Sequence, residues 1–245
     1  VDIVVTGYPA FLALLEQFSG RGGLLLLIAI AVIGIIHYEA FRTIQGLILP
    51  LVTPIVAVTW GKGFMGLAGV PLDIFNMSTP ILILAVGAGH AVQMLKRYYE
   101  EYNLLRANPA LSPREANRIA VIESIVKIGP VMLTAGLVAA AGFLSLIIFD
   151  IVSIRVFGIF AGIGILSVLV IEMTFIPALR AVLPPPGEKE ARMEREERVW
   201  DRITGFYANL MLGEKRSRIF IAAGILVAVA VAGMTQLKIE SALKK

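Results

Sequence analysis

The sequence predicts an all-α membrane protein built as a bundle of six membrane-spanning helices. Hydrophobic residues make up 58% of the 245-residue chain, and the mean hydropathy is +0.83. Both values exceed what a soluble domain of this size needs for its core. Six stretches also lack Asp, Glu, Lys and Arg, and each approaches the roughly 20 apolar residues that cross a bilayer. These stretches are 22–38, 43–61, 74–95, 128–149, 156–171 and 219–237.

The first two stretches read as helices with distinct features. The first is short, but residues 38–41 extend it at the membrane interface, where His37 and Glu39 are also expected. In the second, Pro50 and Pro54 indicate a kink, because proline removes a hydrogen-bond donor from the helix backbone. Neither stretch carries a charge within its length.

The later stretches are joined by polar segments with helical signals. Ser112 as an N-cap, Pro113 and Glu115 predict a surface helix before the fourth stretch, which Gly129 and Pro130 turn inward. The fifth stretch is short but can continue past Glu172. A proline-rich break and a charged stretch, LPPPGEKEARMEREERVWDR, then separate it from the sixth.

Charge asymmetry predicts the orientation of the spans. Sixteen of the 22 basic residues lie on one side, at position 42 and in the segments 96–127 and 180–218. Because Lys and Arg accumulate on the cytoplasmic side, that side is expected inside and both chain ends outside. The basic residues alternate with acidic ones, which argues against a nucleic-acid partner.

The sequence contains no signature of an enzyme or of a metal site. Cysteine is absent, which excludes a disulfide framework and a cysteine metal site. HExxH and GxSxG do not occur, and the two histidines fall on different spans without a nucleophile beside them. No cofactor is predicted. Small residues recur at helix-packing intervals instead, and Gly87 and Gly89 are therefore predicted to support close contacts between helices.

Three motifs carry a resemblance to a known family. GVPLDIFNMSTPILILAVGAGHAVQMLKRYYEE resembles the loop and fourth transmembrane helix of exporters of the RND superfamily, particularly of its MmpL-like and hopanoid-exporter branch. KIGPVMLTAGLVAAAGFLSL and FGIFAGIGILSVLVIEMTFIPAL resemble its fifth and sixth helices. The resemblance covers nearly the whole chain and assigns the six spans to family helices two to seven.

The resemblance implies a domain organisation without the large periplasmic porter domains of the family. The implied segments are the tail of the first periplasmic domain (1–22), a five-helix unit shared with sterol-sensing domains (23–183), a charged linker helix in the cytoplasm (184–216), the seventh helix (217–236) and the start of the second periplasmic domain (237–245).

The resemblance also implies a function. The chain is expected to be the membrane part of an ion-gradient-driven secondary transporter that exports hydrophobic or lipidic substrates from a bacterial inner membrane. Its expected partners are membrane lipids, such a substrate, the remaining half of the transporter and further copies in a homo-oligomer. The alternative is a non-transporting membrane module that responds to sterols or lipids, because the five-helix unit serves both roles.

The candidate coupling residues are His90, Gln93 and Glu172. Where the family has Asp-Tyr in its fourth helix, this chain has Gly89 and His90, so the usual carboxylate is missing. Histidine changes charge near neutral pH, and an ionisable group in a membrane helix is a functional candidate. Two interpretations of His90 remain open: proton relay, or a neutral side chain that hydrogen bonds to a neighbouring helix.

Overall fold

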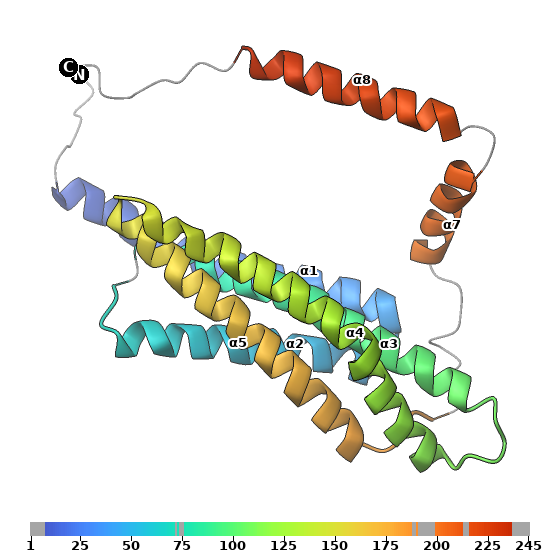
Figure 1. Cartoon of the computed structure of the whole chain (residues 1–245). Helices are drawn as coiled ribbons and strands as arrows, with labels where there is room; N and C mark the ends of the chain where they lie inside the picture. Colours follow the sequence, from blue (N-terminus) through green and yellow to red (C-terminus); the bar gives the residue numbers. More distant parts are fainter. Residues whose placement is uncertain are drawn as a thin grey trace. The chain divides into compact units, whose positions relative to one another are not determined.

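The computed structural model describes residues 8–71, 73, 76–187, 190, 199–212 and 216–236 (Figure 1). Within these residues all regular structure is helical. The chain forms two compact units, Val1–Arg195 and Glu196–Lys245. The first unit contains five long helices: α1 (Tyr8–Phe41), α2 (Ile44–Leu67), α3 (Thr79–Leu105), α4 (Pro113–Leu144) and α5 (Val152–Val182). Two short 3₁₀ helices join them: η1 (Asn76–Ser78) and η2 (Ser145–Ile148).

The second unit contains α7 (Val199–Leu212) and α8 (Arg216–Met234), which contact each other. The apolar part of α8, Phe220–Met234, is shorter than a full span, and it matches the predicted sixth stretch. The predicted boundary at residue 22 falls inside α1, which runs without interruption from Tyr8. The predicted segment 237–245 lies outside the described residues, as do residues 1–7.

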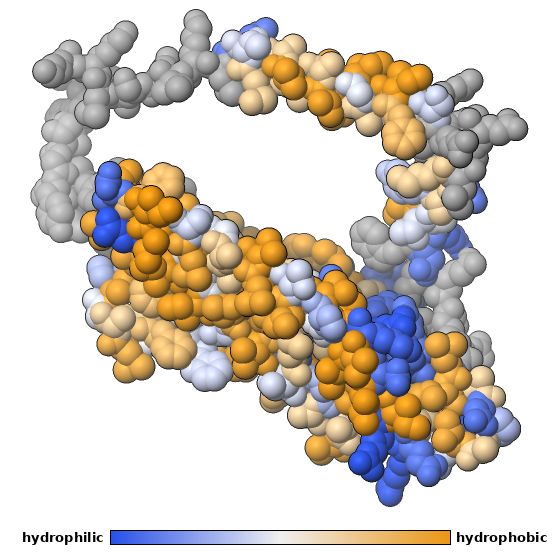
Figure 2. All heavy atoms as spheres, in the orientation of Figure 1, coloured by the Kyte–Doolittle hydropathy of each residue, from blue (hydrophilic) through white to orange (hydrophobic). Residues whose placement is uncertain are grey.

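Five helices of the first unit are long and apolar enough to cross a membrane, which confirms the all-α membrane class. The candidate spans are Gly22–Phe41, Ile44–Leu67, Asn76–Leu105, Pro113–Ile148 and Val152–Val182. The surface of this unit agrees, because on the face that Figure 2 shows apolar residues cover most of its length and hydrophilic residues gather towards its ends. A surface of this kind suits lipid along the sides and water at the two ends.

The helix predicted before the fourth span is present, but it is continuous with that span. The predicted start is confirmed, because Ser112 and Glu115 form a reciprocal capping box at the start of α4. However, α4 then continues as one helix through Pro130. Proline costs one backbone hydrogen bond but is tolerated in membrane helices that neighbours support. Here Gly129 is buried, and a Cβ built on it would lie 3.3 Å from Met173 Cε on α5.

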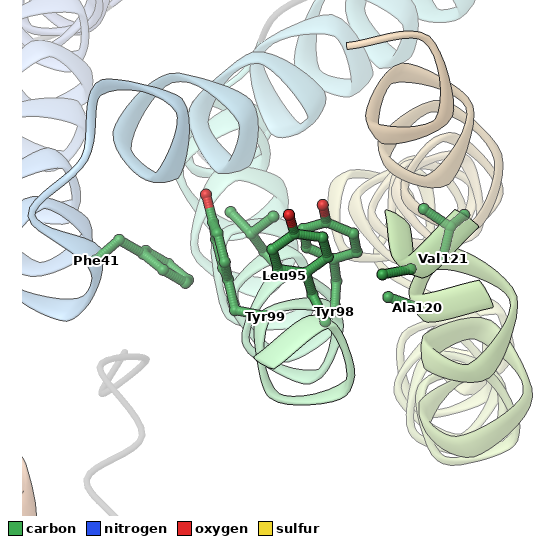
Figure 3. Packing of buried hydrophobic residues seen from close by; sticks show 8 residues of the cluster. Phe41, Leu95, Tyr98, Tyr99, Ala120 and Val121 are labelled. Carbon is green, nitrogen blue, oxygen red and sulfur yellow. The ribbon is translucent and has the colours of Figure 1, made fainter. Parts of the chain in front are cut away.

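Helix α3 is the centre of the five-helix unit, because it contacts α1, α2, α4 and α5. One of its core clusters joins Phe41 of α1 to Leu95, Tyr98 and Tyr99 of α3 and to Val121 of α4 (Figure 3). The Phe41 and Tyr99 ring centroids lie 6.0 Å apart, and those of Tyr98 and Tyr99 lie 5.2 Å apart. Aromatic packing therefore holds α3 in place near its C-terminal end.

Candidate functional site

The structure brings two of the three candidate coupling residues together inside the five-helix unit. His90 lies near the middle of α3, and Glu172 lies on α5. The distance from His90 Nδ1 to Glu172 Oε2 is 3.6 Å. The Glu172 side chain is fully buried, and that of His90 is 12% exposed. An ionisable pair at this depth is expensive to maintain in a membrane protein, which marks it as a candidate site.

The close approach of the helices at this site depends on Gly87, one turn before His90 on α3. A Cβ built on Gly87 would lie 2.8 Å from Pro54 Cβ and 3.0 Å from Val168 Cγ1. It would also lie 3.2 Å from Glu172 Oε1. Only a glycine leaves room for these three groups, so Gly87 allows α2 and α5 to pack against α3 where the carboxylate lies.

Thr53 of α2 completes the site, and the sequence analysis did not single it out. Its side chain is fully buried, and its hydroxyl faces the Glu172 carboxylate. The next residue is Pro54, which has no N–H, so the backbone carbonyl of Pro50 loses its usual helical donor. In the sequence, Thr53 could have been noticed as a hydroxyl residue that directly precedes a proline inside a charge-free span.

The polar atoms of this site are buried without hydrogen bonds to the residues that the structure describes. They are Thr53 Oγ1, His90 Nδ1 and both carboxylate oxygens of Glu172. A buried polar group without a partner costs about 1–3 kcal/mol, and most such groups in folded proteins are bonded. These atoms therefore keep unused hydrogen-bonding capacity within the described part of the chain.

The remaining predicted residues lie elsewhere on α3. Gln93 is exposed, although it follows His90 by three residues and was expected on the same side of α3. Gly89 is also exposed, and a Cβ built on it would meet nothing within 4 Å. Of the two predicted packing glycines, Gly87 is thus the one at a close helix contact.

His37, expected at the membrane interface, is buried within the helix bundle. It is 2% exposed on α1, and its side chain donates a hydrogen bond to the backbone carbonyl of Ala88 on α3. Its Nδ1 atom has no partner among the described residues. The position near the end of a span suggested water contact, but the helix turns this face towards α3.

Across the described residues, no group of three or more His, Cys, Asp and Glu side chains is arranged to hold a metal ion. The site offers one carboxylate, one imidazole and one hydroxyl, and each of these groups can donate or accept a hydrogen bond in one of its protonation states.

Comparison with known proteins agrees with a membrane assignment. The chain is 28% identical to the membrane protein MJ1562 of Methanocaldococcus jannaschii over 186 residues, which is 73% of this chain and 44% of the relative. It is also 28% identical to the membrane protein SCO5905 of Streptomyces coelicolor over 225 residues, which is 84% of this chain and 25% of the relative. The chain thus spans less than half of the length of either relative.

The sequence model of the MMPL family matches residues 1–209, which include all five long helices and the His90–Glu172 pair. The match extends over far more than half of the chain, and it agrees with the motifs in the fourth, fifth and sixth family helices. Together with the five apolar helices, it shows a multi-pass membrane protein: the chain belongs to the MMPL family of the RND superfamily.

Proposed function

We propose that this chain is the membrane part of an ion-gradient-driven transporter that exports hydrophobic or lipidic substrates, with Glu172 and His90 as its proton-coupling pair. Membership of a transporter family supports the general role. The observation that carries the coupling role is the fully buried Glu172 carboxylate, which lies 3.6 Å from His90 without a hydrogen bond. The whole transporter requires its remaining half, and a homo-oligomer is part of the proposal.

Protonation changes what each group of the pair can do. An ionised Glu172 only accepts hydrogen bonds and attracts a protonated His90, whereas a protonated Glu172 donates one to Thr53 or His90. The two states therefore favour different contacts between α2, α3 and α5. A proton that enters from one side and leaves on the other would shift the population of the two arrangements, which is the basis of coupled transport.

Transport by the full-length protein in proteoliposomes tests this proposal. Glu172→Gln keeps the size and polarity of the side chain but removes its proton, so efflux of a lipophilic dye driven by a pH gradient should fall at least about tenfold. His90→Gln should reduce efflux and flatten its pH dependence. Glu100→Gln is the matched control, because Glu100 is an exposed carboxylate on α3, the helix of His90, and is paired with Arg97.

The controls define what would contradict the coupling role. All three variants should fold, as judged by their melting temperatures in detergent, and Glu100→Gln should transport like the unmodified protein. If Glu172→Gln and His90→Gln transport normally with an unchanged pH profile, the pair does not couple protons. His90 would then serve packing alone.

The proposed orientation places the 96–127 and 180–218 segments in the cytoplasm. The sequence has no cysteine, so a thiol reagent reacts only with a cysteine that is introduced by substitution. Ser112 lies between α3 and α4, and Ala68 lies at the far end of α2; both are exposed. Ser112→Cys and Ala68→Cys should react with a membrane-impermeant maleimide from opposite sides. Reaction of both from the same side would refute the topology.

A further inference from the structure

A small hollow lies where the middle of α1 meets the C-terminal part of α2 and the start of α3. Its volume is about 190 Å³. Gly22, Gly23 and Leu26 of α1 line it, together with Lys62 of α2, Met77 of η1 and Pro80 of α3. The apolar spans Gly22–Phe41 and Asn76–Leu105 both begin at these residues, so the hollow lies at the depth of a membrane–water interface.

The two glycines of α1 create the space. A Cβ built on Gly22 would lie 3.5 Å from Met77 Cε, which is an ordinary contact. A Cβ built on Gly23 would meet nothing within 4 Å. A larger side chain at Gly23 therefore has room to enter the hollow without displacing the neighbouring helices.

The charge of the hollow comes from Lys62. The ion pairs formed within the described part of the chain do not include Lys62. The neighbouring acidic residue, Asp73, accepts a hydrogen bond of 2.8 Å from the Asn76 backbone N–H.

An apolar wall with one cation at the interface matches an amphiphile that has one negative charge. Pockets for drug-sized ligands measure roughly 300–1,000 Å³, so this hollow holds only the first part of a single chain. We propose that it binds the head end of a long-chain fatty acid from the membrane, with the carboxylate on Lys62 and the first methylenes between Leu26, Met77 and Pro80. The site is separate from Glu172, and its binding test does not depend on transport.

Photo-crosslinking of the full-length protein in lipid nanodiscs tests the site. The probe is palmitic acid with a diazirine close to its carboxylate. Labelled peptides should map to Gly22–Leu26 and Met77–Pro80. Gly23→Phe should fill the hollow and lower labelling at least about tenfold. Gly63→Phe is the matched control, because a Cβ on Gly63 also meets nothing within 4 Å but Gly63 does not line the hollow.

Charge recognition is tested separately. Lys62→Gln should weaken labelling about two- to fivefold, as expected for an exposed ion pair, and Lys62→Arg should retain it. On the unmodified protein, unlabelled palmitic acid should compete better than hexadecanol of the same chain length. These competition measurements remain informative if a variant folds poorly.

Three results would overturn the proposal. The first is equal labelling of Gly23→Phe and Gly63→Phe when both melt like the unmodified protein. The second is equal competition by hexadecanol and palmitic acid. The third is stronger competition by lysophosphatidic acid than by palmitic acid, which would assign the hollow to a phosphate headgroup instead.

Discussion

Two buried ionisable residues lie on the same helix, α5, and they differ in their hydrogen bonds. Glu172 and Arg180 are both fully buried and lie eight residues apart, a rise of about 12 Å. Both oxygens of Glu172 lack hydrogen-bond partners among the described residues. Arg180 donates to Gln45 Oε1 and, at 2.6 Å, to the hydroxyl of Tyr98. Its guanidinium carbon also lies 4.4 Å from the centroid of the Tyr98 ring.

The partners of Arg180 continue the network across the bundle. The Tyr98 hydroxyl donates to Asn117 Oδ1 at 2.5 Å, and the Asn117 amide donates to the Arg180 carbonyl at 3.1 Å. Tyr102 donates to the Pro186 carbonyl at 3.2 Å. This Arg180 cluster therefore joins α2, α3, α4 and α5 to the segment that follows α5. The hydrogen-bonded Arg180 cluster thus holds helices together, whereas the polar groups around Glu172 are free to form different hydrogen bonds in different protonation states.

The largest expected effect is a difference in protein stability between substitutions at Arg180 and at Glu172. Arg180→Leu leaves two acceptors, Gln45 Oε1 and the Tyr98 hydroxyl, without their donor. At about 1–3 kcal/mol for each acceptor, the free energy of unfolding should fall by about 2–6 kcal/mol. Glu172→Gln removes a buried ionisable group whose oxygens have no hydrogen-bond partner among the described residues, so it should leave stability unchanged or raise it. Thermal unfolding in detergent, followed by circular dichroism, measures both.

A third variant controls for the loss of an arginine in general. Arg114 is exposed near the start of α4, and Arg114→Leu should change the melting temperature little. If Arg180→Leu melts like Arg114→Leu, the Arg180 cluster does not stabilise the bundle. If Glu172→Gln is the more destabilising of the two buried changes, Glu172 stabilises the bundle more than Arg180 does.

The sequence could predict features that depend on local pattern. The long spans are visible because charges are missing over about 20 residues, and the capping box at Ser112 follows from its spacing to Glu115. His90 and Glu172 were identified because each interrupts or borders a charge-free stretch. In all these cases the signal lies in neighbouring residues of the chain.

Features that depend on what lies across a helix contact could not be predicted. Arg180 entered the sequence analysis only as one basic residue among sixteen, because its partners Gln45, Tyr98 and Asn117 come from three other helices. Thr53 stayed unnoticed for the same reason. Gly87 and Gly89 have the same sequence signal, and only the faces they turn to neighbouring helices distinguish them.

An intermediate effect should distinguish these two glycines. Gly87→Ala places a Cβ within 2.8 Å of Pro54 and 3.0 Å of Val168, so α2 or α5 must shift at a cost of about 1–3 kcal/mol. Gly89→Ala meets open space and should be neutral or stabilise the helix by up to about 1 kcal/mol. Melting temperatures in detergent compare the two, and equal losses would mean that α3 does not pack closely at Gly87.

The smallest expected effect compares two buried hydroxyls, one bonded and one not. Ser124 on α4 donates to the Val121 carbonyl at 2.8 Å, so Ser124→Ala should cost about 0.5–1.5 kcal/mol. Thr53 Oγ1 has no hydrogen-bond partner among the described residues, so Thr53→Val keeps the shape of the side chain and should change stability by less than about 0.5 kcal/mol. Urea unfolding in mixed micelles resolves this difference. A loss for Thr53→Val that matches or exceeds that for Ser124→Ala would show that Thr53 already bonds firmly to Glu172, and the site would then be as fixed as the Arg180 cluster.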